Sequence, residues 1–136
     1  LRPDALAEYL VGQKSMRFWL EWDRGTMNVR DLAIKFTSYT HYLTSREWAK
    51  EDTLPPLLVC VAPEVAQERR IHHVAHARLT STHGLVLWTT TEGLLNAHGP
   101  LAPIWLQGVP RSSQPVQSER PRRRCWLDVV PGGNGT

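Results

Sequence analysis

The stretch Asp4-Ala-Leu-Ala-Glu-Tyr-Leu-Val-Gly-Gln-Lys-Ser-Met-Arg-Phe-Trp-Leu-Glu-Trp-Asp23 decides how this chain begins to fold. Residues 4–10 predict a strand, residues 11–15 a turn that contains a glycine, and residues 16–23 a second strand. Side chains alternate between the two faces of a strand. One face of the second strand is then formed by Met16, Phe18, Leu20 and Trp22, and the other by Arg17, Trp19, Glu21 and Asp23. The sequence therefore predicts an antiparallel hairpin.

Three carboxylates meet at the open end of the predicted hairpin. A turn in the middle of the stretch places Asp4 opposite the residues from Glu21 to Asp23. Such a cluster is costly without a compensating cation, and carboxylate oxygens are ligands that Mg²⁺ and Mn²⁺ prefer. We therefore expect Asp4, Glu21 and Asp23 to bind a divalent metal. The alternative is that Glu21 and Asp23 face solvent and pair with Arg17 and Arg24.

The rest of the body alternates between predicted helices and strands. Asn28 is a favourable N-cap, and Asp31 follows in the first turn, where a carboxylate suits a helix start. The expected elements are a helix over 28–43, a strand over 57–62, a helix over 64–79, a strand over 85–90, a helical turn near 92–97 and an edge segment over 101–106. This order predicts an α/β fold with a mixed β-sheet, opened by an antiparallel hairpin and flanked by helices.

Charge divides the chain into a body and a tail. Residues 1–107 carry as many basic as acidic side chains, whereas residues 108–136 are rich in Pro, Ser and Arg and account for the net charge of +3. We therefore expect a folded domain over 1–107 and a basic, flexible tail over 108–136. Because the body is neutral, the high pI is weak evidence for a nucleic-acid surface on the folded domain.

The sequence carries no sign of export or of membrane insertion. Its apolar runs are far shorter than a membrane span, and no signal-peptide pattern opens the chain. The two cysteines form no CxxC pattern, so a disulfide framework is not expected. These features predict a cytoplasmic protein without a membrane partner. The absence of an initiating Met indicates a fragment or a processed product.

Four motifs follow one another along the chain: Pro3-Asp4, Glu21-x-Asp23, a helix carrying Lys35-x-x-x-Tyr39, and the strand over 57–62. In this order they resemble the PD-(D/E)xK nuclease superfamily. Within that superfamily, residues 2–90 look like the replication-relaxation family of bacterial plasmids and mobile elements. The resemblance implies a restriction-endonuclease-like core and a DNA substrate, with replication or mobilisation proteins as further partners.

The resemblance assigns a role to each matched residue. Asp4 and Glu21 match the metal-binding acids, whereas Asp23 stands where the superfamily keeps its catalytic Lys. Lys35 can replace that Lys, because some members place it on the following helix, where a cation offsets developing phosphoryl charge. Tyr39 would orient Lys35 or contact phosphate. The implied function is Mg²⁺-dependent hydrolysis of DNA, and the alternative is a catalytically inactive nuclease-fold module that binds DNA or a protein partner.

Basic and aromatic residues add candidates for DNA contacts. Arg24 follows the second strand, and Arg69 and Arg70 lie on the expected helix over 64–79. The Arg-rich run over 120–124 is expected either to track a DNA backbone or to be a tail without function. Trp19 shares the acidic face and could stack on a base, but ordinary packing is the favoured interpretation because the chain has six tryptophans.

A histidine pair on the same expected helix is a weaker metal candidate. His72 and His76 stand at i and i+4, the spacing of two zinc ligands on one helix face. No third ligand follows at a recognisable spacing, so an exposed helix face is the favoured interpretation.

Overall fold

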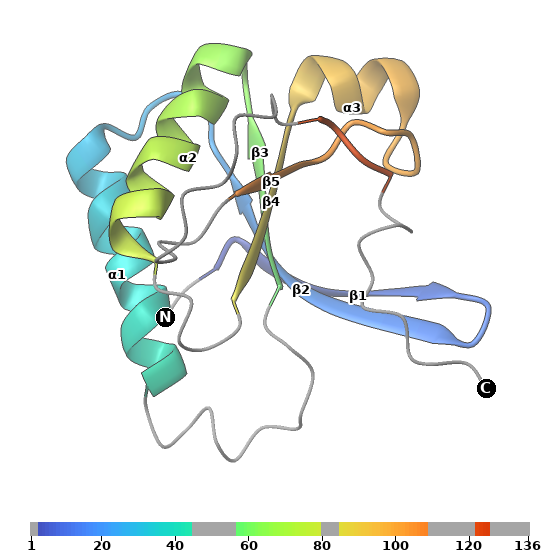
Figure 1. The fold of residues 1–136 in the computed structure, drawn as a ribbon, viewed down its shortest axis with the longest axis horizontal. Helices are drawn as coiled ribbons and strands as arrows, with labels where there is room; N and C mark the ends of the chain where they lie inside the picture. Colours follow the sequence, from blue (N-terminus) through green and yellow to red (C-terminus); the bar gives the residue numbers. More distant parts are fainter. Residues whose placement is uncertain (1–2, 45–56, 80–84, 109–121, 126–136) are drawn as a thin grey trace.

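A five-stranded mixed sheet forms the centre of the chain (Figure 1). The computed structural model describes residues 3–44, 57–79, 85–108 and 122–125. Their elements are β1 (Ala5–Val11), β2 (Lys14–Trp22), α1 (Val29–Thr44), β3 (Leu57–Ala62), α2 (Val65–Arg78), β4 (Val86–Thr91), α3 (Glu92–His98) and β5 (Leu106–Gly108). The strands lie in the order β1-β2-β3-β4-β5. The predicted α/β class, with a mixed sheet opened by a hairpin, is confirmed.

The hairpin is tighter than expected. Val11 pairs with Lys14, so the turn has only Gly12 and Gln13 in place of the five residues predicted. Gly12 adopts a φ of 59°, which glycine tolerates without steric cost. Ala5 pairs with Leu20. The next step along this register places Asp4 opposite Glu21, as the sequence predicts.

The sheet is parallel at its centre and antiparallel at both edges. β1 runs antiparallel to β2, the strands β2, β3 and β4 run parallel, and β5 runs antiparallel to β4. The carboxyl ends of β2, β3 and β4 consequently meet at one edge of the sheet. Asp23 extends this edge, because its backbone N–H donates to Val61 O at 2.8 Å. Ligand sites of open α/β sheets commonly lie outside this edge.

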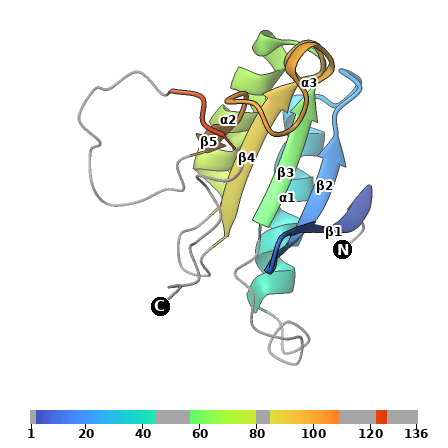
Figure 2. The same cartoon turned by 90° about the vertical axis from the view of Figure 1, so that its right-hand side faces the viewer.

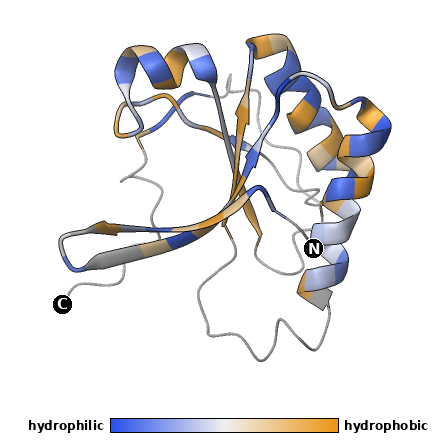
Figure 3. Ribbon diagram, turned by 180° about the vertical axis from the view of Figure 1, so that it is seen from behind, coloured by the Kyte–Doolittle hydropathy of each residue, from blue (hydrophilic) through white to orange (hydrophobic). Residues whose placement is uncertain are grey.

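One face of the sheet is covered by α1 and α2 (Figures 1 and 2). Both helices mix hydrophilic and hydrophobic residues along their length, as expected of helices with one face in solvent (Figure 3). The core beneath them contains Trp19 from β2, Phe36 and Tyr39 from α1, and Leu58 from β3. Trp19 thus packs between the sheet and the helices.

The opposite face carries a second apolar cluster. Met16, Val59, Trp88 and Trp105 are buried there, and side chains of α3 pack against them. Phe18 and Leu20 contribute from β2, so the predicted segregation of the strand into two faces is confirmed. Within the described ranges, no helix has the length and apolar character that a membrane crossing needs.

The boundary expected between body and tail at residue 107 falls inside the sheet. Gly108 belongs to β5, where it pairs with Leu87, and Arg124 forms an antiparallel bridge with Trp105. Part of the expected flexible tail is therefore attached to the domain by backbone hydrogen bonds. The remaining tail residues, 109–121 and 126–136, lie outside the described residues.

Candidate functional site

A buried carboxylate on β2 is held by two side chains of α1. Glu21 is only 4% exposed, and its Oε1 accepts a hydrogen bond from the Tyr39 hydroxyl. Its Oε2 forms an ion pair with Lys35 Nζ. Lys35 and Tyr39 stand at i and i+4, so they project from the same side of the helix. The structure thus brings together three of the residues that the sequence singled out.

Burial and hydrogen bonding set the protonation of this group. Desolvation raises the pKa of Glu21 above 4.5, and the neighbouring Asp4 charge adds to the rise. Lys35 and Tyr39 oppose that shift by stabilising the carboxylate. Burial, together with Glu21, raises the pKa of Tyr39, which therefore remains a neutral hydrogen-bond donor.

Asp4 lies beside this group at the open end of the hairpin. Its side chain is exposed, and Oδ2 accepts a hydrogen bond from the Trp22 backbone N–H at 2.7 Å. The Trp22 indole in turn donates to Glu92 Oε1 at 2.6 Å, which ties β2 to the start of α3. Asp4 therefore has a fixed position and a solvent-facing charge. We call Asp4, Glu21, Lys35 and Tyr39 the Glu21 cluster.

Asp23 has a structural role that the sequence did not predict. The side chain is 3% exposed, and its Oδ1 accepts a hydrogen bond from the Gly25 backbone N–H at 2.7 Å. Gly25 has a φ of 79°, a conformation that residues with a Cβ rarely adopt. This Asx turn lets the chain leave β2 and reach α1.

The expected metal site with three carboxylate ligands is not found. Among the described residues, no group of three or more His, Cys, Asp or Glu side chains is arranged to hold a metal ion. The reason is local, because an Asp23 oxygen serves the turn while Asp4 remains at the rim. Mg²⁺ needs only one or two carboxylates when water and substrate phosphate complete its shell. Asp4 and Glu21 match that smaller requirement in the number and type of ligands.

A small cavity adjoins the buried acids. It has a volume of about 10 Å³ and is lined by Glu21, Asp23 and Lys35, with Cys60 at its wall. This volume is close to the minimum that holds one water molecule, on the order of 10–15 Å³. Burial raises the pKa of Cys60, so its thiol is neutral. The cavity beside Glu21 is therefore at the lower limit of the space that one water molecule needs.

The other DNA-contact candidates differ in exposure. Arg24, Arg69 and Arg70 are exposed, as a phosphate contact requires. Trp19 is buried, with its ring centroid 5.3 Å from that of Tyr39 and 5.7 Å from that of Tyr42. The favoured packing interpretation of Trp19 is therefore confirmed, and base stacking by Trp19 is wrong.

The histidines of α2 do not form a zinc pair. His72 Nε2 lies 2.6 Å from Thr89 Oγ1, whereas His76 is exposed. The Thr89 hydroxyl donates its single proton to Glu68 Oε2, so His72 must donate from Nε2 to the Thr89 oxygen. Burial lowers the pKa of His72, in keeping with a neutral ring. His72 belongs to a buried polar network rather than to a metal site.

That network contains a buried ion pair that was not predicted from the sequence. Glu68 is 1% exposed, and both its carboxylate oxygens accept hydrogen bonds from the Arg123 guanidinium. Arg123 Nη1 also donates to Ile104 O at 2.9 Å. The signal available in the sequence was the position of Glu68, three residues before Ile71 on the inward stripe of α2. An acid at such a position requires a partner.

Comparisons of the chain with protein families, curated proteins and solved structures find no match.

Replacement of Glu21 by Gln is expected to change how stability depends on pH. Because the folded pKa of Glu21 is raised, the native protein binds more protons than the unfolded chain from pH 4.5 up to that raised value. Its contribution to stability is therefore complete below pH 4.5 and is lost as pH rises through the window. In urea unfolding between pH 4 and 8, the free energy of unfolding should fall less with rising pH in Glu21→Gln than in the parent. The same pH dependence in both proteins would contradict a raised pKa of Glu21.

Proposed function

We propose that this chain is a DNA-processing domain that hydrolyses phosphodiester bonds with the help of Mg²⁺ or Mn²⁺. The observation that carries the proposal is the ion pair between Lys35 and Glu21. Asp23 stands where the resembled superfamily has its Lys, and Lys35 supplies a cation at the same carboxylate from the neighbouring helix. The Glu21 cluster thus contains both carboxylates for a metal and a cation for the phosphate.

Each residue of the Glu21 cluster has a task in this proposal. Asp4 and Glu21 would hold the metal, which supplies Lewis-acid activation of the phosphate and of a water molecule. Lys35 offsets the charge that develops on the phosphate in the transition state. Tyr39 fixes the Glu21 carboxylate through its hydroxyl hydrogen bond. Asp23 shapes the turn and borders the small cavity, where it assists through water.

The position of the cluster suits a long polyanionic substrate. It lies at the carboxyl edge of the parallel strands, where the sheet meets solvent and where Arg24 follows β2. Arg69 and Arg70 are exposed on α2, which covers the same face of the sheet as α1. We propose that these arginines contact the DNA backbone, which gives salt-sensitive binding with little sequence preference.

The proposed family context follows from the resembled motifs. A restriction-endonuclease-like core and a place in a plasmid or mobile-element replication protein are both parts of the proposal. Replication or mobilisation proteins are then further partners. The hairpin-opened mixed sheet, with its acids at the strand ends, is compatible with that core.

A specific observation favours the second candidate, a catalytically inactive module that binds DNA or a protein partner. Both oxygens of Glu21 already have a partner within the protein: the Tyr39 hydroxyl donates to Oε1, and the Lys35 ammonium forms an ion pair with Oε2. A metal would share these oxygens through their remaining lone pairs. If the ion pair between Lys35 and Glu21 is too stable to admit a metal, the cluster only holds α1 against β2.

Lys35→Met separates the two candidates. In Mg²⁺ or Mn²⁺, we expect the parent chain to cleave at least one of single-stranded, duplex or branched DNA. The variant should lose about 10²–10³-fold in kcat, the cost of removing one group that stabilises transition-state charge. Lys35→Arg keeps the cation on Glu21, and Arg30→Met removes an exposed cation of α1, so it serves as the matched control. Binding without cleavage of any DNA form in either metal would favour the inactive module.

A further inference from the structure

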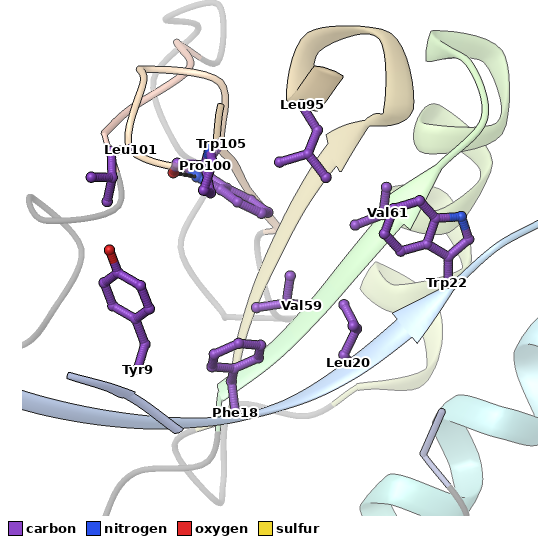
Figure 4. Close-up of a pocket in the computed structure, with 10 residues that line it drawn as sticks. All are labelled: Tyr9, Phe18, Leu20, Trp22, Val59, Val61, Leu95, Pro100, Leu101 and Trp105. Carbon is purple, nitrogen blue, oxygen red and sulfur yellow. Dashed lines mark hydrogen bonds between the residues drawn. The ribbon is translucent and has the colours of Figure 1, made fainter. Parts of the chain in front are cut away.

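An apolar pocket opens on the face of the sheet that α1 and α2 leave free (Figure 4). Its volume is about 280 Å³, and its exposed lining is entirely apolar. The wall includes Tyr9, Phe18, Val59, Leu95, Leu101 and Trp105, which point toward a common space in Figure 4. These residues come from β1, β2, β3, α3 and the segment that leads to β5. We call this site the apolar pocket.

The apolar pocket is exposed at an energetic cost. Leu101 at its rim is 50% exposed, although burying a side chain of this size stabilises a protein by about 1.5–3 kcal/mol. An apolar hollow of this volume has room for apolar side chains of another segment. The lining residues are aliphatic or aromatic, and the surface that they expose in the pocket offers no polar group to orient a small polar ligand. The occupant should therefore be apolar.

A backbone bridge brings a late part of the same chain to the wall of the apolar pocket. Trp105, a wall residue, accepts a hydrogen bond from Arg124 N at 2.7 Å and donates one to Arg124 O at 3.1 Å. The bridge is antiparallel. Past Arg124, the chain is therefore directed along the segment from Ile104 back toward Leu101, which forms the rim of the apolar pocket.

The residues that come next have the required chemistry. Trp126-Leu127-Asp128-Val129-Val130 is an apolar run within an otherwise Pro-, Ser- and Arg-rich segment. Trp126 is two residues from Arg124, and each residue extends the chain by at most about 3.3–3.6 Å. The covalent link to Arg124 also gives the run an effective concentration at the pocket on the order of mM, as short linkers do. No long loop has to be closed for contact.

We propose that the run Trp126–Val130 docks in the apolar pocket of its own chain. Trp126 is the anchor, because a tryptophan buries on the order of 150–250 Å² and dominates contacts of this kind. The docked run covers the second face of the sheet, opposite the face covered by α1 and α2. This inference is independent of the Glu21 cluster and of the proposed DNA chemistry.

Methyl NMR of the full chain tests the docking directly. A tryptophan ring shifts the resonances of methyl groups in contact with it, so Trp126→Ala should move the signals of Val59, Leu95 and Leu101. Signals of the exposed Val29 and Val65, on the helices of the other face, should stay in place. Trp48→Ala is the matched control, since it removes an indole from a different segment of the sequence. Unmoved pocket signals in Trp126→Ala would overturn the proposal.

Other occupants give different results. A second copy of the chain would make the pocket signals depend on protein concentration, and pocket shifts in Trp48→Ala would assign the site to the segment around that residue. Either outcome overturns the proposal. A double-mutant cycle with Leu101→Ala and Trp126→Ala provides a second measurement, because residues in contact give unfolding free energies that do not add. Additive effects of the two substitutions would likewise exclude the contact.

Discussion

Asp4→Asn and Glu21→Gln are each expected to abolish metal-dependent DNA cleavage while leaving the fold intact. The proposed site has only these two carboxylates for the metal, so the loss of either charge removes much of its affinity. We expect a fall of at least about 10²–10³-fold in kcat/KM, comparable to removing one charge-stabilising group from an active site. Single-turnover cleavage in Mg²⁺, with circular dichroism to verify folding, measures the effect.

Both substitutions are conservative in shape. An asparagine at position 4 retains an oxygen that can accept the Trp22 backbone N–H, so the hydrogen bond now made by Oδ2 at 2.7 Å survives. A glutamine at position 21 retains an oxygen for the Tyr39 hydroxyl. What each variant loses is a negative charge. Glu8→Gln, on exposed β1, removes a charge from the same hairpin and should cleave like the parent. Unchanged cleavage by either site variant would refute the proposed metal site.

The hairpin was predictable because its signals are local, whereas the approach of Lys35 and Tyr39 to Glu21 was expected mainly from the resemblance. Alternation along residues 16–23 fixes which side chains face α1, and a two-strand register brings Asp4 to Glu21 once the hairpin forms. The i, i+4 spacing of Lys35 and Tyr39 then places both on one side of a helix. The turn was the weaker part, since two residues with Gly12 at positive φ suffice where five were expected.

The misjudged residues depend on partners that periodicity does not reveal. Asp23 shares a face with Glu21, yet its Oδ1 accepts a hydrogen bond from the backbone N–H of Gly25, two residues away. The alternation of a strand does not predict the turn that forms this bond. Packing was favoured for Trp19, but its partners Tyr39 and Tyr42, across the interface between sheet and helix, were not predicted. Glu68 acquires Arg123 from a distant part of the sequence. Long-range pairing of this kind cannot be read from spacing.

The Glu68–Arg123 pair is expected to have the largest effect on stability. Arg123→Met leaves the Glu68 carboxylate, whose side chain is 2% exposed, without its cation. Breaking a buried pair in this way costs about 3–5 kcal/mol, because the remaining charge is desolvated and uncompensated. Arg124→Met is the matched control, since the Arg124 side chain is exposed and its bridge to Trp105 uses backbone atoms. Urea unfolding at neutral pH measures both.

The double variant Glu68→Met/Arg123→Met shows whether the loss arises from the unpaired charge. Removing both partners leaves no buried charge behind, so the pair of substitutions should destabilise the protein less than Arg123→Met alone. The Thr89 hydroxyl then loses its acceptor at Glu68 Oε2, which explains why some loss should remain. If Arg123→Met unfolded at the same urea concentration as Arg124→Met, Arg123 would not hold its segment to the domain. A much lower urea midpoint for Arg123→Met than for Arg124→Met would instead show that the ion pair with Glu68 attaches Arg123 to the domain.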